Sequence, residues 1–172
     1  VKRHDVALKA FKLLHAQNPN SRYLIAGEGP MRAPMEQLAS ELGIDAGVQF
    51  LGHRTDVADL IQAADVMLLT SRSEAQSQAL TQSIGLGLPV VATAVGGVPE
   101  VVLHERTGLL VPPDDPEATA AALLRIANDP ALAKTLGEQG KAHAHQHYSL
   151  EVMLDRSEAV YRQLCQRSAV RP

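Results

Sequence analysis

The sequence predicts an α/β fold, a Rossmann-like doubly wound parallel sheet within one domain over residues 1–172. Two observations predict it. Short, uniformly apolar segments alternate with helical patterns of about 10–14 residues, which is typical of βαβ units whose sheet is covered by helices on both faces. Hydrophobic residues make up 45% of the chain and charged residues 20%, as expected of a globular domain.

The elements follow one another at regular intervals. Apolar pairs between positions 6 and 14 predict a first helix that ends near Asn18-Pro19. Asp115-Pro116-Glu117 predicts a later helix start, because it joins a capping residue, a proline and an acid near the positive end of the helix dipole. Helical patterns continue to about residue 167, and we expect these C-terminal helices to pack on the domain. Strands are expected at 22–27, 48–52, 65–70, 89–93 and 108–112, with helices at about 31–42, 56–64 and up to 84, and a helical turn at 99–103.

The strand that opens a Rossmann-like sheet is absent from this pattern, which begins with a helix. In the strand order 3-2-1-4-5-6, that first strand lies in the middle of the sheet. We therefore expect an unfilled position between the strands at 22–26 and 66–69, and a chain that is part of a longer protein. Unpaired N–H and C=O groups at such a position would favour association between copies.

Composition excludes several classes of function. The net charge of −3 and an aromatic content of 3% do not favour nucleic-acid binding. Cys165 is alone, so no disulfide framework or paired-cysteine metal site is expected, and a cytoplasmic location is the simplest interpretation. No secretory signal opens the sequence. The uncharged stretch at 75–99 contains Gln and Thr and a Gly-Leu-Gly-Leu-Pro break, which indicates a buried helix and strand rather than a membrane span.

One loop has polar residues where such folds bind ligands. Open parallel sheets bind at the carboxyl ends of their strands, and the predicted strand at 65–70 is followed by SRSEAQSQALTQ (71–82) at a helix start. Free N–H groups at a helix start suit a diphosphate. Glu74 can accept hydrogen bonds from sugar hydroxyls, and Gln82 follows about two helical turns later, within reach of the same ligand. Spacing alone favours the alternative of a solvated loop acid and a surface amide.

The other candidates are weaker. Gly27 and Gly29 lie in a Gly-Glu-Gly-Pro turn, but the segment is no full G-x-G-x-x-G, so a tight turn is the default interpretation. Gly96-Gly97 forms a second predicted turn. Histidines alternate at 143, 145 and 147, but no carboxylate or cysteine at matching spacing supports a metal site. From the residues alone, the predicted function is binding of a nucleotide or phosphate.

Four segments, in this order and at typical spacings, resemble one enzyme family. They are LIAGEGP (24–30), VQFLGHRTDVADLIQAADVMLLTSRSE (48–74), GLPVVATAVGGVPEVV (87–102) and TGLLVPPDDPEATAAAL (107–123). Together they are similar to the C-terminal donor-binding domain of retaining glycosyltransferases of the GT-B fold, often called glycosyltransferase family 4. The resemblance covers about residues 2 to 165. It implies one half of a GT-B architecture that binds a nucleotide-diphosphate sugar.

The resemblance also implies roles for particular residues. Glu74 matches the first Glu of the family's Glu-x7-Glu, which contacts hydroxyls of the transferred sugar. The backbone of Ala75-Gln76-Ser77 would lie against the sugar and the diphosphate. Lys2 matches the lysine that neutralises the leaving diphosphate. We expect further donor-binding residues at two strand ends, with the second group seating the nucleotide base: Gly27 and Gly29, then Gly52, His53 and Arg54.

Three departures from the family's pattern concern the same site. Gln82 replaces the second Glu, which binds the ribose hydroxyls. Ala75-Gln76-Ser77 stands where the family has Gly-Phe-Gly, and Arg3 stands where a Gly follows the lysine. The N-terminal acceptor domain is missing from this chain, together with the family's phosphate-binding arginine upstream of the lysine.

The function expected from the resemblance is retaining, metal-independent transfer of a sugar from a nucleotide-diphosphate sugar to an acceptor held by the missing domain. The chain alone is expected to bind donor and transfer nothing. No cofactor and no metal are expected, and contact with the inner membrane face only through the missing domain. Two alternatives stay open: a nucleotide-sugar epimerase of the same fold, and a non-catalytic binding module, which Gln82 and the altered loop favour.

Overall fold

The computed structural model describes residues 1–169 and contains two parallel sheets. In the first, β1 (Tyr23–Ala26) pairs with β2 (Val48–Gly52). In the second, β4 (Val90–Thr93) lies between β3 (Met67–Leu69) and β5 (Leu109–Val111). Together they provide the five parallel strands expected from the sequence.

The two sheets are not hydrogen-bonded to each other, since β1 and β3 belong to different ladders. This confirms that the strands on either side of the expected unfilled position are not paired directly. Burial follows the pairing: every residue of β4 is buried, whereas Leu24 and Ala26 of β1 are exposed.

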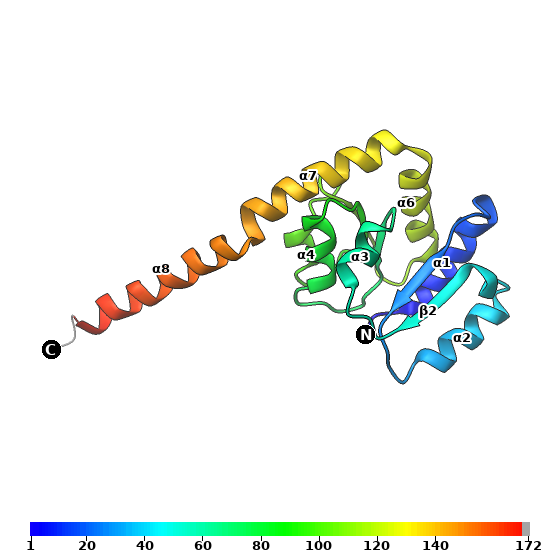
Figure 1. Ribbon diagram of the computed structural model, residues 1–172, viewed down its shortest axis with the longest axis horizontal. Helices are drawn as coiled ribbons and strands as arrows, with labels where there is room; N and C mark the ends of the chain where they lie inside the picture. Colours follow the sequence, from blue (N-terminus) through cyan, green and yellow to red (C-terminus); the bar gives the residue numbers. More distant parts are fainter. Residues whose placement is uncertain (170–172) are drawn as a thin grey trace.

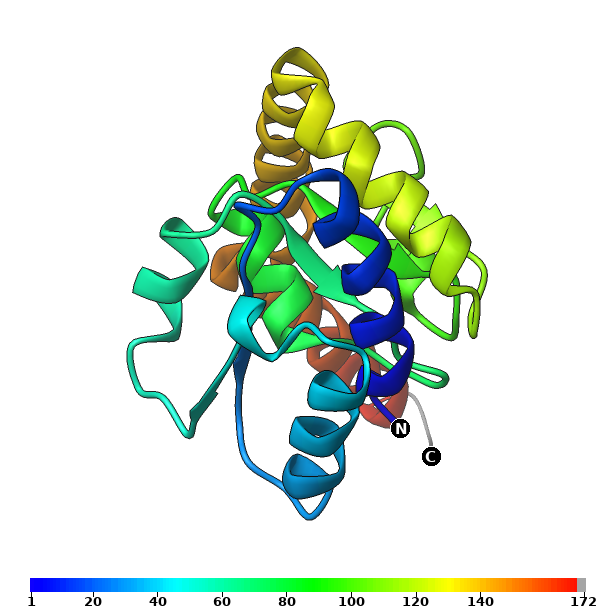
Figure 2. The same ribbon diagram turned by 90° about the vertical axis from the view of Figure 1, so that its right-hand side faces the viewer.

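Helices cover both faces of the β3–β5 sheet, as a doubly wound fold requires. On one face, α1 (His4–Gln17) packs against α6 (Pro116–Asn128), and the two lie side by side in Figure 2. The other face is covered by three helices, α4 (Gln78–Gly85), α5 (Val98–Val101) and α7 (Pro130–Tyr148). A single apolar cluster joins residues from α1, from β2 and from β4 and β5, so packing connects the two sheets where hydrogen bonds do not: Leu8, Phe11, Val48, Val91 and Leu109.

The remaining short elements connect the strands. These are α2 (Arg32–Glu41) and the 3₁₀ turn η1 (Asp45–Gly47) between β1 and β2, and α3 (Val57–Gln62) between β2 and β3. The start of α6 is as predicted: the Asp115 carboxylate accepts a hydrogen bond from the Ala118 N–H at 2.8 Å, and Pro116 is the first helical residue.

The last helix, α8 (Leu150–Ala169), projects away from the sheets (Figure 1). Ser149 takes an extended conformation (φ −68°, ψ 160°) and separates α8 from α7. Six large apolar residues of α8 are at least half exposed: Leu150, Met153, Leu154, Val160, Tyr161 and Leu164. The expectation that the C-terminal helices pack on the domain as far as residue 167 is therefore wrong for α8, because helical periodicity does not report which neighbour an apolar face meets.

Candidate functional site

The N-terminal segment of the chain lies across the carboxyl end of β3. The Arg72 N–H donates to the Val1 carbonyl at 3.0 Å. The Thr70 hydroxyl, directly after β3, lies 3.0 Å from the carbonyl oxygens of both Lys2 and Arg3. These contacts bring residues 1–3 to the loop that follows β3, where the sequence predicts the ligand.

Lys2 and Glu74, which are 72 residues apart in the chain, form an ion pair there. The Lys2 Nζ lies 2.5 Å from Glu74 Oε2, and the Ser71 hydroxyl donates to the same oxygen at 3.1 Å. The Glu74 side chain is only 13% exposed, whereas that of Lys2 is 50% exposed. Glu74 Oε1 has no partner in the part of the chain that the structure describes. One carboxylate oxygen is thus held in place and the other is available to accept a hydrogen bond.

The loop after Glu74 has its own fixed geometry. The Glu74 carbonyl accepts a hydrogen bond from the Gly97 N–H at 3.0 Å. Ser77 caps α4, its hydroxyl accepting from the Leu80 N–H at 3.4 Å. The N–H groups of Ala75 and Gln76 have no acceptor within residues 1–169, and both residues are exposed. Unpaired N–H groups beside a lysine make this loop suitable for an anion.

Gln82 lies on α4, but not at the expected offset. The helix begins at Gln78, so Glu74 lies in the loop before it and not on the helix. Gln82 is therefore about one helical turn after the helix start, whereas the sequence predicted two helical turns between Glu74 and Gln82. The Gln82 side chain is exposed, and its amide has no hydrogen-bond partner among the described residues. The structure therefore does not join Gln82 to Lys2 or Glu74 by a hydrogen bond.

Arg3 forms an ionic cluster next to this pair that the sequence does not predict. Its guanidinium donates to both oxygens of Asp5 at 2.9 Å and also contacts Asp114 in the β5–α6 loop. Asp114 is 3.6 Å from Arg72 as well. Hydrogen bonds from Arg3 hold the pKa of the Asp5 carboxyl below its usual value. Arg3 and Asp114 are 111 residues apart, so only the tertiary structure brings them together. The one signal in the sequence that could have indicated Asp114 is its position just after the strand expected at 108–112.

Arg3 also has left-handed backbone angles (φ 51°, ψ 48°), which L-residues other than Asn and Asp rarely adopt. This conformation explains physically why a glycine suits the position after the lysine, as the family resemblance implies. In this chain, Arg3 adopts the same backbone geometry, and its side chain forms ion pairs with Asp5 and Asp114.

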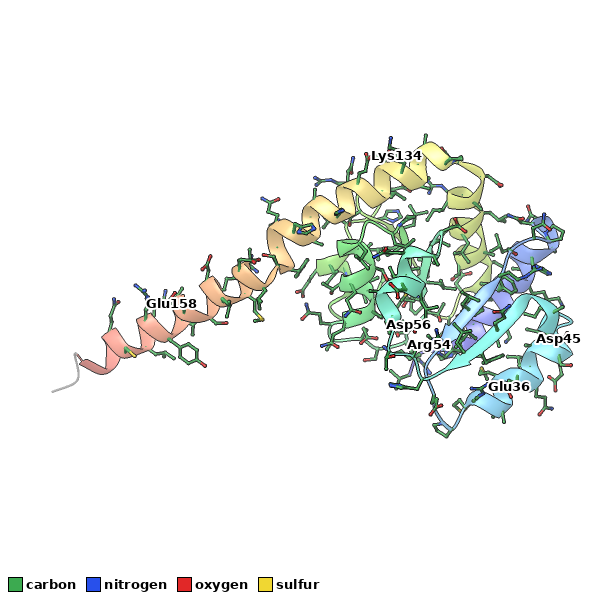
Figure 3. The ribbon with its side chains drawn as sticks, in the orientation of Figure 1. Glu36, Asp45, Arg54, Asp56, Lys134 and Glu158 are labelled. Atoms are coloured by element: carbon green, nitrogen blue, oxygen red, sulfur yellow. The ribbon has the colours of Figure 1, made fainter. Side chains whose placement is uncertain are left out.

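The glycines of the two predicted strand-end groups lie at the carboxyl ends of β1 and β2. The Gly27 N–H donates to the Gly52 carbonyl at 2.7 Å, and both have positive φ, 127° and 67°. His53 and Arg54 are exposed, and the Arg54 guanidinium binds both oxygens of Asp56, at 2.8 and 2.5 Å (Figure 3). These hydrogen bonds lower the pKa of Asp56.

Gly29 lies in the same turn, where its carbonyl accepts from the Arg32 N–H at 3.1 Å. Within residues 1–169, no hydrogen bond or ion pair joins either strand-end group to Lys2 or Glu74, so the predicted base-binding residues are separate from that ion pair.

Two further features lie away from this edge. A groove at the amino ends of β3 and β4 is lined by Asp65, Gly87, Lys134 and Lys141 among others, on the side opposite to ligand binding in such folds. The rings of His143 and His147 lie with centroids 4.6 Å apart and planes tilted by 48°, but the described residues contain no cluster of three potential metal ligands. No helix in residues 1–169 is long and apolar enough to cross a membrane.

Sequence comparison places this chain among known transferases. A family described as "Glycosyl transferases group 1" matches residues 1–143. The N-acetyl-alpha-D-glucosaminyl L-malate synthase of Bacillus anthracis is 30% identical over 161 residues, which cover 94% of this chain and 42% of that protein. The D-inositol 3-phosphate glycosyltransferase of Saccharomonospora viridis is 36% identical, over 95% of this chain and 40% of that protein. The chain thus spans about two fifths of the length of these relatives.

Solved structures show the same fold. Sucrose-phosphate synthase from Thermosynechococcus elongatus superposes with a TM-score of 0.83 at 33% identity, over 93% of this chain and 42% of that one. The Anabaena protein HepE, determined in complex with UDP-glucose, superposes with a TM-score of 0.85 at 24% identity, over 94% and 45% of the two chains. These matches confirm that the fold is that of the C-terminal domain of GT-B glycosyltransferases.

Proposed function

The chain belongs to the group 1 glycosyl transferases, and from this premise we propose that it binds the nucleotide-diphosphate sugar from which the family transfers sugar. Transfer itself would need an acceptor site, which we assign to a further domain, as the greater length of the relatives supports. HepE, whose structures contain UDP and UDP-glucose, shares only the fold with this chain, so its ligands suggest a class of donor and not a base or a sugar.

One observation carries the proposal: Lys2 and Glu74 meet at the carboxyl end of β3, beside the unpaired N–H groups of Ala75 and Gln76. A donor needs two recognition elements, a positive environment for its diphosphate and hydrogen-bond acceptors for its sugar hydroxyls. The ammonium of Lys2 and the two N–H groups supply the first. Glu74 Oε1 supplies the second.

The same groups suggest how transfer is assisted. When the bond to the sugar breaks, negative charge develops on the departing diphosphate. The Lys2 ammonium stabilises that charge, and backbone N–H groups that are already oriented do so without further reorganisation. We propose that transfer proceeds with retention and without a divalent metal, as the family resemblance implies. Chelation of divalent metals should then leave turnover unchanged in a protein that carries both domains.

A second function deserves a test because of one observation. Gln82 lacks the charge of the family's second Glu, and within residues 1–169 its side chain makes no hydrogen bond to the other candidate residues. A module that binds nucleotide sugars without transferring them would tolerate this loss. An epimerase of the same fold would share the donor site and differ only in the fate of the sugar.

Calorimetric titration of the chain with UDP, GDP and ADP, and with their sugars, tests the proposal. We expect one nucleoside diphosphate to bind and Lys2→Ala to lower its affinity, because the proposed role of the ammonium is to neutralise the phosphates. Lys134→Ala, at an exposed side chain of α7, is the matched control and should leave the affinity unchanged. A folded chain that binds none of the three would overturn the proposal.

A further inference from the structure

We propose that the Gly96-Gly97 turn between β4 and α5 positions the donor loop, by holding two peptide groups so that the N–H groups of Ala75 and Gln76 face the diphosphate. The identity of the ligand rests on the proposed function. The orientation of the peptide groups rests on the contacts of the turn alone.

The turn approaches the loop more closely than any side chain would allow. The Gly97 N–H donates to the Glu74 carbonyl at 3.0 Å. A Cβ on Gly96 would overlap the carbonyl oxygen of Glu74, and a Cβ on Gly97 would overlap that of Ala75. Both neighbours are backbone atoms, which cannot give way as the end of a flexible side chain can. The carbonyl groups of Glu74 and Ala75 therefore pack directly against Gly96 and Gly97.

This contact determines where the N–H groups of the loop point. In a trans peptide, the C=O of one residue and the N–H of the next point in opposite directions. Because the Glu74 and Ala75 carbonyls face the turn, the N–H groups of Ala75 and Gln76 face away from it. Neither has an acceptor in the described part of the chain. Adjacent N–H groups that point to one side form the kind of concavity that binds phosphate.

Close packing of glycines also occurs for purely structural reasons, and the chain contains a matched example. A Cβ on Gly137 of α7 would overlap the carbonyl oxygen of Gly87, near the amino end of β4. Gly97 has an ordinary φ of −83°, and Gly137 is helical, so alanine strains the backbone at neither position. Gly97→Ala and Gly137→Ala thus introduce the same type of clash, one at the donor loop and one far from it.

The first test needs no ligand. In ¹H–¹⁵N spectra of the chain, Gly97→Ala should shift the amide signals of Ala75 and Gln76 more than any others outside the turn. Gly137→Ala should instead shift signals near Gly87. Unchanged Ala75 and Gln76 signals in folded Gly97→Ala would overturn the inference.

The second test measures the consequence for binding, with whichever of UDP, GDP and ADP binds best and with its nucleoside. Gly97→Ala should weaken the diphosphate by at least about tenfold, as expected for one lost charge-assisted hydrogen bond, and leave the nucleoside unaffected. Gly137→Ala should lower the thermal midpoint without changing the ratio of the two affinities. The inference would be contradicted if Gly97→Ala lowered the affinity for the diphosphate and for the nucleoside equally. It would also be contradicted if Gly137→Ala changed the ratio of the two affinities as much as Gly97→Ala does. If wild type binds none of the three, the proposed function fails, and the amide shifts alone decide the orientation of the loop.

Discussion

At the scale of single residues, Glu74 differs from an ordinary solvated loop acid because neighbouring side chains hold its carboxylate in place. Two donors, Lys2 and Ser71, fix one carboxylate oxygen in a side chain that is only 13% exposed. The alternative of a solvated loop acid, which spacing alone favours, does not fit this burial.

In a protein that carries both domains, Glu74→Gln should lower turnover about ten- to a hundredfold, as expected when a charge-assisted hydrogen bond to the sugar is lost. Binding of the free nucleoside diphosphate should stay within about twofold, since that ligand has no sugar to contact. Steady-state kinetics and calorimetry measure the two effects. Glu138→Gln, at an exposed side chain of α7, is the control, and wild-type turnover in Glu74→Gln would remove Glu74 from the site.

If Gln82 contacts the ribose of the proposed donor, its amide would donate to one hydroxyl and accept from the other, but without charge assistance. The difference is on the order of 1 kcal/mol, so Gln82→Glu should tighten nucleoside diphosphate binding several-fold. Titration of Gln78→Glu, an exposed position on the same helix, controls for the added charge. Weaker binding by Gln82→Glu would mean that the amide donates to a specific partner other than the ribose.

His143 links stability to pH. Its Nε2 is buried without a hydrogen-bond partner among residues 1–169, and burial lowers its pKa from the usual 6.5. The unfolded chain therefore binds more protons than the folded chain near that pH, so the free energy of unfolding falls as the pH decreases below about 6.5. His143→Phe should make this dependence shallower in denaturant titrations between about pH 7 and 5. His145→Phe, exposed on the same helix, should not.

At the scale of elements, α8 differs from the other helices. It is amphipathic and long, but it projects from the body with exposed apolar side chains (Figure 1). Helices α6 and α7 instead bury several apolar residues each, among them Leu123 and Leu136. Removal of α8 should therefore cost little of the folding free energy.

A chain that ends at Ser149 should unfold within about 3 °C of the complete chain, because a change of 1 kcal/mol corresponds to roughly that shift in a domain of this size. A chain that ends at Asn128 lacks α7, whose Leu136 and Ala144 are buried, and should not fold cooperatively. Calorimetry distinguishes the two. A large loss of stability in the first truncation would show that α8 packs on the body in solution.

At the scale of the whole molecule, two sheets share one layer of helices without pairing to each other. This leaves unpaired backbone groups on β1 and β3, whereas β4 is paired on both sides. Amide hydrogen exchange should be slowest in β4 and faster in β1 and β3. If protection of β1 and β3 increases with protein concentration, copies of the chain pair through these edges. Protection of β1 equal to that of β4 at low concentration would contradict the open position.

Local chemistry in the sequence was sufficient for the elements and their order. Apolar periodicity, the Asp115-Pro116 cap and the glycine-rich turns act over a few residues, so they can be read without the fold. The fold class and the absence of pairing between the strands at 22–26 and 66–69 follow from this information, combined with the standard strand order. The family follows only from the resemblance of four ordered segments. The position of Glu74 after the strand at 65–70 already indicated a ligand-binding residue, whereas Lys2 was found only by resemblance, because no local pattern relates residues 72 apart.

Tertiary structure alone determined the contacts that make the candidate site. The pairing of Lys2 with Glu74, the approach of Gly97 to the Glu74 carbonyl and the contact of Arg3 with Asp114 each join distant segments. Such contacts depend on which strand ends lie together and how the loops between them fold. The same reason accounts for α8: an apolar helical stripe shows that a face can be buried, and only the fold shows whether a partner lies against it.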